Sequence, residues 1–301
     1  MRVLIVGCGY VGLSVGTGLI RQGHEVFGLR RNPAGEKELL AAGISPLFAD
    51  ITRLEELKKL PGGYDWVVHC VAAGGDGENY RHVYFDGTTT LLKWLAPNLP
   101  QKFVYTSSTS VYAQNDGSPV NEASPVEPLA ETSKILVETE KILLRAAVES
   151  PGNPSKPGFP AVILRVAGIY GPERGQWFKQ FLKGLAKIEG DGSRFLNMIH
   201  REDVAGCIMA ALQRGHPGEI YNAVDNEPVT QLHFFQWLAK TLGKDLPPIA
   251  SKDLPRQRGV TNKQVSNAKL RAELKYEFQY PDFRAGYAAE IARLGAFKEK
   301  L

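Results

Sequence analysis

The feature that most constrains the fold of this 301-residue chain is a glycine-rich turn near its N-terminus. Residues 7–12 read Gly-Cys-Gly-Tyr-Val-Gly. They follow the apolar strand pattern Arg2–Val6 and overlap the start of the helical pattern Tyr10–Gln22. A Gly-x-Gly-x-x-Gly sequence between a strand and a helix is typical of dinucleotide binding, although the same letters alone are a weak signal.

The three glycines of this turn have different expected tasks. Gly7 permits the sharp turn, Gly9 lets the backbone approach a pyrophosphate, and Gly12 brings the helix close to the strand. Free N–H groups at the helix start, at Tyr10 and Val11, then face the phosphates, helped by a partial positive charge of ~0.5 e. The alternative is a tight turn that binds nothing.

Short apolar runs alternate with longer helical patterns through the first half of the chain. Continuous apolar strands that alternate with helices predict a parallel sheet covered on both faces, that is, an α/β fold with a Rossmann-type doubly wound sheet. The further strand patterns are Glu25–Leu29, Ser45–Phe48, Trp66–Val71, Lys102–Thr106 and Ala161–Val166, and the helical patterns are Glu36–Ala42, Leu54–Leu60, Tyr84–Leu95 and Leu129–Ala147.

After Gly171 this rhythm changes, and helical patterns are separated by isolated short strands. We therefore predict a nucleotide-binding domain over residues 1–168, to which the chain returns around 195–225, and a smaller mixed α/β substrate domain over 169–301. The later helical patterns are Trp177–Lys187, Val204–Gln213 and Thr230–Leu242, and the later strand patterns are Arg194–Ile199 and Glu219–Asn222.

Composition excludes several classes of protein. The net charge of +4 is spread over interleaved acids and bases, which argues against nucleic-acid binding. Cys8, Cys70 and Cys207 are far apart, as expected of reduced thiols in a cytoplasmic protein, and no ligand spacing suggests a metal. Residues 3–20 carry no charge, but their glycines favour a strand, turn and helix over a signal peptide or membrane span.

Two arginines at the end of the second strand pattern bear on cofactor choice. Arg30 and Arg31 stand near the position where an NAD enzyme carries an acidic residue for the ribose hydroxyls. Guanidinium groups there suit a 2′-phosphate, so we predict NADP rather than NAD, with NADPH bound more tightly than NADH. Arg30→Ala is expected to narrow that difference, unless both arginines are ordinary surface residues.

The ends of the next two strand patterns complete the predicted cofactor site. Asp50, followed by Ile51, can accept a hydrogen bond from an adenine amino group. Val71, Ala72 and Ala73 are small enough to leave room for the nicotinamide and its ribose. In open α/β sheets, ligands bind at the carboxyl ends of the strands, which is where these residues stand.

Several motifs in a fixed order carry a resemblance to a known family. Together they resemble the extended short-chain dehydrogenases/reductases, the NAD(P)-dependent epimerase/dehydratase family, over nearly the whole chain. The resemblance includes Val166 among the residues at the cofactor. The motifs are the glycine turn, the pair Asp50-Ile51, residues 106–112 (Thr-Ser-Ser-Thr-Ser-Val-Tyr), residues 165–172 (Arg-Val-Ala-Gly-Ile-Tyr-Gly-Pro) and residues 199–205 (Ile-His-Arg-Glu-Asp-Val-Ala).

The resemblance implies a catalytic set, and this chain departs from it. Ser108 matches the family's Ser/Thr, and Lys134 matches the Lys that holds the nicotinamide ribose and lowers the pKa of a tyrosine. That tyrosine should precede Lys134 by four residues, where this chain has Ala130. Asp86 occupies the place of the family's Asn. The pattern is similar to the atypical branch of the superfamily.

A missing tyrosine matters because carbonyl reduction needs a proton, and a positioned acid or base contributes about 10²–10⁴-fold. Tyr80, Tyr84, Tyr112 or Tyr170 could substitute, although family positions favour structural roles for the last two. We expect an NADP-dependent oxidoreductase or epimerase-like enzyme that acts on a small carbonyl or sugar-derived compound. The alternatives are a non-catalytic NADP(H)-binding redox regulator and, less favoured, a structural partner protein.

The resemblance also bears on assembly. Members of the family often dimerise through a four-helix contact, so a homodimer through the helical patterns Tyr84–Leu95 and Leu129–Ala147 is one expectation. No membrane or nucleic-acid partner is expected.

Overall fold

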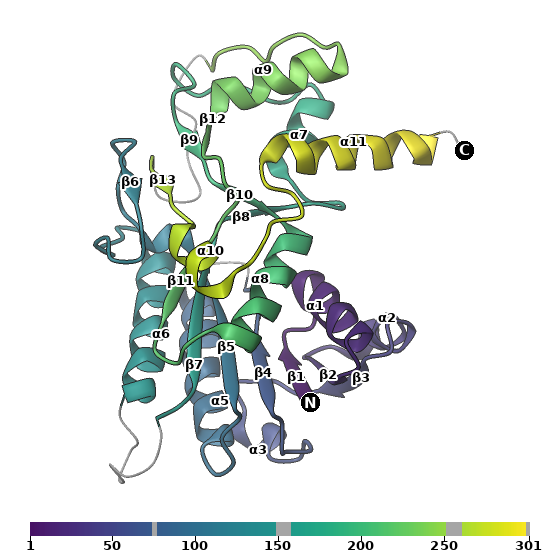
Figure 1. The fold of residues 1–301 in the computed structure, drawn as a ribbon, viewed down its shortest axis with the longest axis vertical. Coiled ribbons are helices and arrows are strands. Elements are labelled where there is room, and N and C mark those ends of the chain that lie inside the picture. The colour runs from purple at the N-terminus through teal and green to yellow at the C-terminus, as the bar shows by residue number, and fades with distance from the viewer. Residues whose placement is uncertain (74–76, 149–157, 251–260, 299–301) are drawn as a thin grey trace.

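The structure is a computed structural model, and it describes residues 1–73, 77–148, 158–250 and 261–298. Its centre is a seven-stranded sheet in the order β11-β7-β5-β4-β1-β2-β3, in which every neighbouring pair is parallel (Figure 1). The strands are β1 (Arg2–Val6), β2 (Glu25–Arg30), β3 (Ser45–Phe48), β4 (Trp66–His69), β5 (Lys102–Ser108), β7 (Ala161–Val166) and β11 (Ile220–Ala223).

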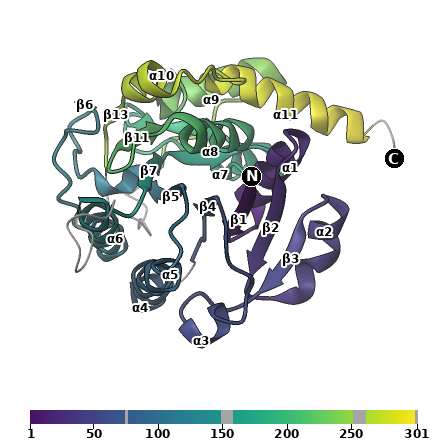
Figure 2. The same cartoon turned by 60° about the horizontal axis from the view of Figure 1, so that its bottom comes forward.

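Helices cover both faces of this sheet. Figure 2 shows α1 and α8 on one side of the strands and α5 and α6 on the other. The helices of this half are α1 (Tyr10–Arg21), α2 (Glu36–Ala41), α3 (Leu54–Leu57), α4 (Gly77–Tyr80), α5 (Gly87–Leu95), α6 (Glu131–Val148) and α8 (Arg201–Arg214). The predicted doubly wound α/β architecture is confirmed.

The central strands are apolar because both of their faces are buried. All six residues of β7 and four of the five in β1 are buried between the helix layers. Burial of this kind contributes roughly 25 cal/mol for each Å² of apolar surface removed from water. This cluster fixes the carboxyl ends of the strands, where loops are free to carry function.

A second, smaller cluster lies beyond those ends. It is rich in aromatic rings, among them Phe234, Phe235 and Phe283, all fully buried. Its elements occupy the upper part of Figure 1, with α11 extending to one side. The remaining elements are the helices α7 (Gln176–Leu182), α9 (Gln231–Leu242), α10 (Ala268–Leu274) and α11 (Phe283–Lys298), and the strands β6 (Pro119–Val120), β8 (Gly168–Tyr170), β9 (Phe195–Leu196), β10 (Met198–His200), β12 (Val229–Thr230) and β13 (Gln264–Val265).

Two predicted elements differ from the structure in more than their bounds. The helix expected at Tyr84–Leu95 begins at Gly77 and contains a π-helical turn over Arg81–Asp86 before α5. The strand expected at Arg194–Ile199 is divided at Asn197 into two short strands, and the Asn197 side chain bonds the backbone of Lys263 and Val265. Within the described residues, no helix is long and apolar enough to cross a bilayer.

Candidate functional site

A cavity of about 1700 Å³ opens at the carboxyl ends of the sheet strands. Pockets for small molecules usually measure about 300–1,000 Å³, so this one has room for a dinucleotide and a second molecule. One wall comes from the loops after β1, β2, β3, β4, β5 and β7, and the other from residues of the smaller cluster. The site thus lies where open α/β sheets bind ligands.

The glycine turn forms the floor of this cavity at the start of α1. Gly7 has a φ of +83°, and a Cβ built there would lie 2.6 Å from the backbone of Val71. A Cβ on Gly12 would lie 2.9 Å from the carbonyl oxygen of Gly7. A Cβ on Gly9, in contrast, would meet nothing closer than 4.0 Å. Gly7 and Gly12 are therefore needed by the fold itself, whereas Gly9 leaves the turn open toward the cavity.

The start of α1 is also left without a cap. None of the described side chains bonds its first N–H groups, and its first turn carries no acidic residue. Tyr10 and Val11 line the cavity at this point. Uncapped N–H groups at a helix start, together with the helix dipole, attract an anion such as a pyrophosphate.

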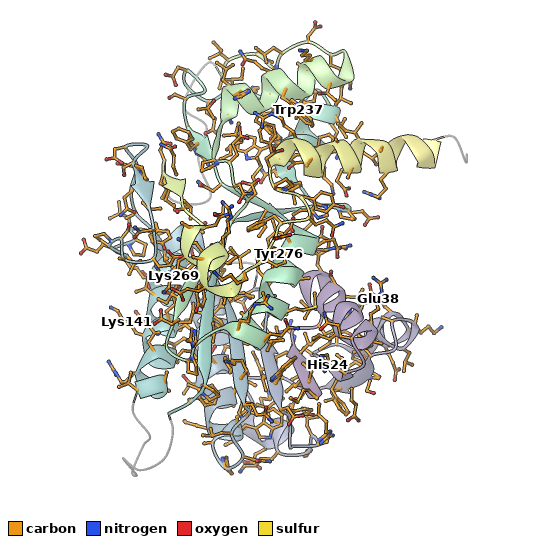
Figure 3. All side chains as sticks on the ribbon, viewed as in Figure 1. His24, Glu38, Lys141, Trp237, Lys269 and Tyr276 are labelled. Carbon is orange, nitrogen blue, oxygen red and sulfur yellow. The ribbon has the colours of Figure 1, made fainter. Side chains whose placement is uncertain are left out.

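The two arginines after β2 differ in how they are held. Arg30 donates to the carbonyl oxygen of Cys8 at 2.5 Å and to Glu38 at 2.7 Å. Glu38, labelled in Figure 3, extends from α2. Arg31 is exposed at the cavity wall, and no ion pair to it is found among the described residues. Arg30 thus ties the turn to α2, and Arg31 is the guanidinium available to a ligand.

Tyr10 connects the glycine turn to the second half of the molecule. Its hydroxyl donates to the carbonyl oxygen of Pro172 at 2.9 Å. Two guanidinium groups lie over its ring, Arg174 at 4.2 Å and Arg201 at 4.8 Å from the ring centroid. Of these two arginines, Arg174 also lines the cavity.

The remaining predicted cofactor residues lie in the cavity wall as well. Asp50 accepts from the backbone N–H and the hydroxyl of Thr52. Burial opposes ionisation of Asp50, but the Thr52 hydrogen bonds, and then the charges of Arg31 and Arg53, hold its pKa below the ordinary value. The other lining residues of this group are Ile51, Val71, Ala72, Ala73 and Val166.

Of the three predicted catalytic residues, only Ser108 lines the cavity. It ends β5, and its Oγ accepts from the backbone N–H of Ser110 at 3.2 Å. Ser133 on α6 also lines the cavity and donates to the Ser110 hydroxyl at 3.1 Å. One residue further along a helix points about 100° away. Lys134 accordingly faces solvent, with a side chain 52% exposed and 3.7 Å from Glu131.

Asp86 is likewise outside the cavity lining. Its side chain is 52% exposed and lies 3.5 Å from Nδ1 of His82. The π-helical turn before α5 changes the register of this segment, so that Tyr80, His82 and Tyr84 face the cavity instead. Catalytic roles for Asp86 and Lys134 stay predictions, and this arrangement does not bring them to the site.

The four tyrosines considered as substitutes for the family's tyrosine fall into two groups. Tyr112 is fully buried, donates to Asn222 and accepts from Arg165. Tyr170 is buried and stacked on Tyr287 with centroids 4.3 Å apart. Their geometry suits packing, as the sequence favours.

Tyr80 and Tyr84 form the other group. Their rings lie against each other with centroids 4.6 Å apart, and both line the cavity. The hydroxyl oxygen of Tyr84 accepts from the backbone N–H of Ala73, at 3.4 Å. This places a phenol beside the segment predicted to hold the nicotinamide.

A buried ion pair beneath the site was not predicted from the sequence. Arg165 on β7 and Glu140 on α6 pair at 2.7 Å with both side chains only 3% exposed. Ser107 donates to Glu140, and the guanidinium also lies over the ring of Tyr112. This network holds the end of β5 in place beneath the cavity.

Comparison with known proteins agrees with this geometry. The model of the NAD dependent epimerase/dehydratase family matches residues 3–223. Protein YeeZ of Escherichia coli (strain K12) is 30% identical over 293 residues, which cover 93% of this chain and 97% of that relative.

Solved structures with the same fold include a functionally unknown conserved protein from Silicibacter pomeroyi DSS. It is 28% identical, with a TM-score of 0.79 over 97% of this chain and 98% of that chain. The double mutant of DesIV, a dTDP-glucose 4,6-dehydratase from Streptomyces venezuelae with NAD and DAU bound, has a TM-score of 0.80. At 23% identity over 96% of this chain and 95% of that chain, it shares the fold. The chain therefore belongs to the NAD-dependent epimerase/dehydratase family.

Proposed function

We propose that this protein is an NADPH-dependent oxidoreductase or epimerase-like enzyme for a small carbonyl or sugar-derived compound. The observation that carries the proposal is the open glycine turn, where Gly9 faces a cavity with room for a dinucleotide and a second molecule. Relatives with dehydratase and epimerase names add support from the family. A cytoplasmic location and a homodimer remain part of this proposal.

The residues present fit a dinucleotide along the cavity. The turn and the start of α1 would bind the pyrophosphate, Arg31 the 2′-phosphate and Asp50 the adenine amino group. When bound, the nicotinamide supplies or accepts hydride. Ser108 offers a hydroxyl that can polarise a substrate oxygen, and Tyr84 offers a phenol that bonds the backbone of Ala73.

Replacing Arg31 with alanine is expected to weaken NADPH binding about tenfold or more and to leave NADH binding nearly unchanged. A hydrogen bond to a charged group contributes about 1.5–3 kcal/mol, and only NADPH carries the 2′-phosphate. Arg30→Ala is expected to weaken the binding of both NADPH and NADH, because Arg30 holds the carbonyl of Cys8 within the turn. Fluorescence titration of each variant measures these affinities, and equal losses for NADPH and NADH in Arg31→Ala would contradict the assignment.

Arg174 and Arg201 offer a matched pair on the ring of Tyr10. Arg174→Ala is expected to lower NADPH affinity about 5- to 20-fold, because its guanidinium lies at the cavity beside the pyrophosphate site. Arg201→Ala removes the other cation from the same ring but none from the cavity, so it should change affinity less than twofold. Calorimetric titration with NADPH compares the two variants. Similar losses of NADPH affinity in both would mean that the effect arises from the cations on the Tyr10 ring and not from a charge at the cavity.

A non-catalytic NADP(H)-binding regulator is the second candidate, and Ala130 together with the outward Lys134 favours it. Cofactor oxidation with a panel of carbonyl compounds and nucleotide sugars separates the two. NADPH oxidation faster than that of NADPH without protein supports the enzyme. The protein-dependent rate should fall in Ser108→Ala. Tight NADPH binding without turnover on any compound supports the regulator.

A further inference from the structure

A buried lysine lies in the wall of the second half of the cavity. Lys263 precedes β13 and lines the cavity, yet the residue is only 4% exposed. Its ammonium donates to the carbonyl oxygen of Tyr112 at 3.0 Å. An ammonium has three N–H donors, so two remain for another acceptor.

The charge of Lys263 has no carboxylate partner among the described residues. Buried cations in proteins are normally paired, because an isolated buried charge costs several kcal/mol. The charged neighbour that acts most on Lys263 is another cation, Arg194. Arg194 is itself paired with Glu189, at 3.0 Å. The described part of the cavity wall therefore offers Lys263 no negatively charged acceptor.

The wall around Lys263 is positive as a whole. Among the described cavity-lining residues from 168 onward, four are cationic and one is a carboxylate, Glu189. The cations are Arg174, Lys187, Arg194 and Lys263. Clefts lined by one sign of charge concentrate ligands of the opposite sign.

We infer that Lys263 is the anchor of a substrate subsite for a compact anion, a carboxylate or phosphate group of the small molecule. This rests on the proposed function, since it names the class of compound that shares the cavity with the cofactor. The anion takes the two donors of the ammonium that Tyr112 leaves unused.

The position of Lys263 also explains how such an anchor aids chemistry. Tyr112 follows Ser108 by four residues, and both line the same cavity. An anion held at the Tyr112 end therefore places the rest of the substrate along the segment that leads to Ser108. Holding a substrate in this way lowers the reaction barrier by positioning, and it offsets part of the rate lost because Ala130 replaces the family's tyrosine.

Protonation of Lys263 makes the subsite dependent on pH. Burial, and then the charge of Arg194, lower the pKa of Lys263 to about 8. Of the other charged residues that line this wall, Glu189 pairs with Arg194, and Arg174 and Lys187 are further cations. Tyr112 contributes its carbonyl oxygen. Anion affinity should be full at pH 7 and decline as the pH rises through 8 and the ammonium loses its proton.

The test is calorimetric titration of the wild-type chain, with and without NADPH, using malonate, inorganic phosphate and UDP-glucose as probes. Malonamide is the matched neutral probe. We expect malonate or phosphate to bind, malonamide not to bind, and Lys263→Met to weaken the anion about 30-fold or more. Lys263→Arg should restore binding and remove its decline between pH 7 and 9.5, because arginine stays protonated.

Lys102→Met is the control for loss of a partly buried lysine. Lys102 also donates to a backbone carbonyl, that of Gly215, but it lies outside the cavity lining. This variant should bind the anion as the wild type does. NADPH affinity and circular dichroism of Lys263→Met show whether its fold is intact. If this variant is unfolded, the pH dependence of anion binding in Lys263→Arg decides whether the subsite exists.

The outcomes separate this inference from the proposed function. Equal binding of malonate and malonamide, unchanged anion affinity in Lys263→Met, or the same pH decline in Lys263→Arg each overturns the subsite. Binding of UDP-glucose alone, without either compact anion, overturns it as well. Failure of the wild type to bind NADPH overturns the proposed function. The anion titration of the same protein still tests whether Lys263 binds a compact anion.

Discussion

Gly7→Ala is expected to destabilise the protein by about 2–5 kcal/mol and to abolish dinucleotide binding. The backbone at Gly7 has a φ of +83°, which costs a residue with a Cβ about 1–2 kcal/mol. The new methyl would also lie 2.6 Å from the backbone of Val71, and forcing an extra methyl into a packed site adds about 1–3 kcal/mol. Urea denaturation followed by circular dichroism measures the loss.

Gly9→Ala is the matched control, two residues along the same turn. Its Cβ would have no heavy atom closer than 4.0 Å, so stability should stay within about 1 kcal/mol of the wild type. The methyl would project where the pyrophosphate approaches the backbone, so NADPH affinity should fall about tenfold or more. Normal NADPH affinity in a folded Gly9→Ala protein would mean that the cofactor does not lie on this turn.

Glu140→Ala is expected to cost about 3–5 kcal/mol of unfolding free energy. Removing one member of a buried ion pair leaves the other charge without a partner in a medium of low polarity. Here the uncompensated group is the guanidinium of Arg165, with both side chains only 3% exposed in the intact protein. The hydroxyl of Ser107 loses its acceptor as well.

Glu138→Ala provides the comparison on the same helix. Glu138 pairs with Arg81 at 2.6 Å, but its side chain is 44% exposed. Ion pairs in contact with water contribute little, so the unfolding midpoint should hardly change. Equal destabilisation by the two variants would indicate that α6 itself, and not the buried pair, is what the substitutions disturb.

The sheet and the turn were predictable because their signals are local. Short apolar runs such as Ala161–Val166 are long enough for a buried strand and flanked by helical patterns. The turn needs only the glycines and their place between β1 and α1. These features depend on a few consecutive residues. They also led to the predicted cofactor residues, of which Gly7, Gly9 and ten others line the cavity.

The rest of the site depends on contacts between distant parts of the chain. Arg174 reaches the turn through Tyr10, whose hydroxyl bonds a carbonyl 162 residues away. Lys263 enters the cavity because its ammonium meets Tyr112 across 151 residues. Neither position stands in a motif with a mechanism, so no sequence signal marks them.

Register is the other quantity that the sequence leaves open. Motif matching assigns Lys134 to the site, but Ser133, one residue earlier, is the one that faces the cavity. The π-helical turn that directs Asp86 to solvent has no composition that distinguishes it from an ordinary helical turn. A rotation of about 100° per residue is enough to exchange a site residue for a surface one.

The most direct test of the account is calorimetric titration of the wild-type protein with NADPH and, separately, NADH. We predict that one NADPH binds per chain and that its dissociation constant is at least about tenfold lower than that of NADH, because we propose that Arg31 at the cavity wall binds the 2′-phosphate. Equal affinities would contradict the assignment of the cofactor as NADP(H). Absence of binding by either dinucleotide would contradict the account of the glycine turn as a cofactor site.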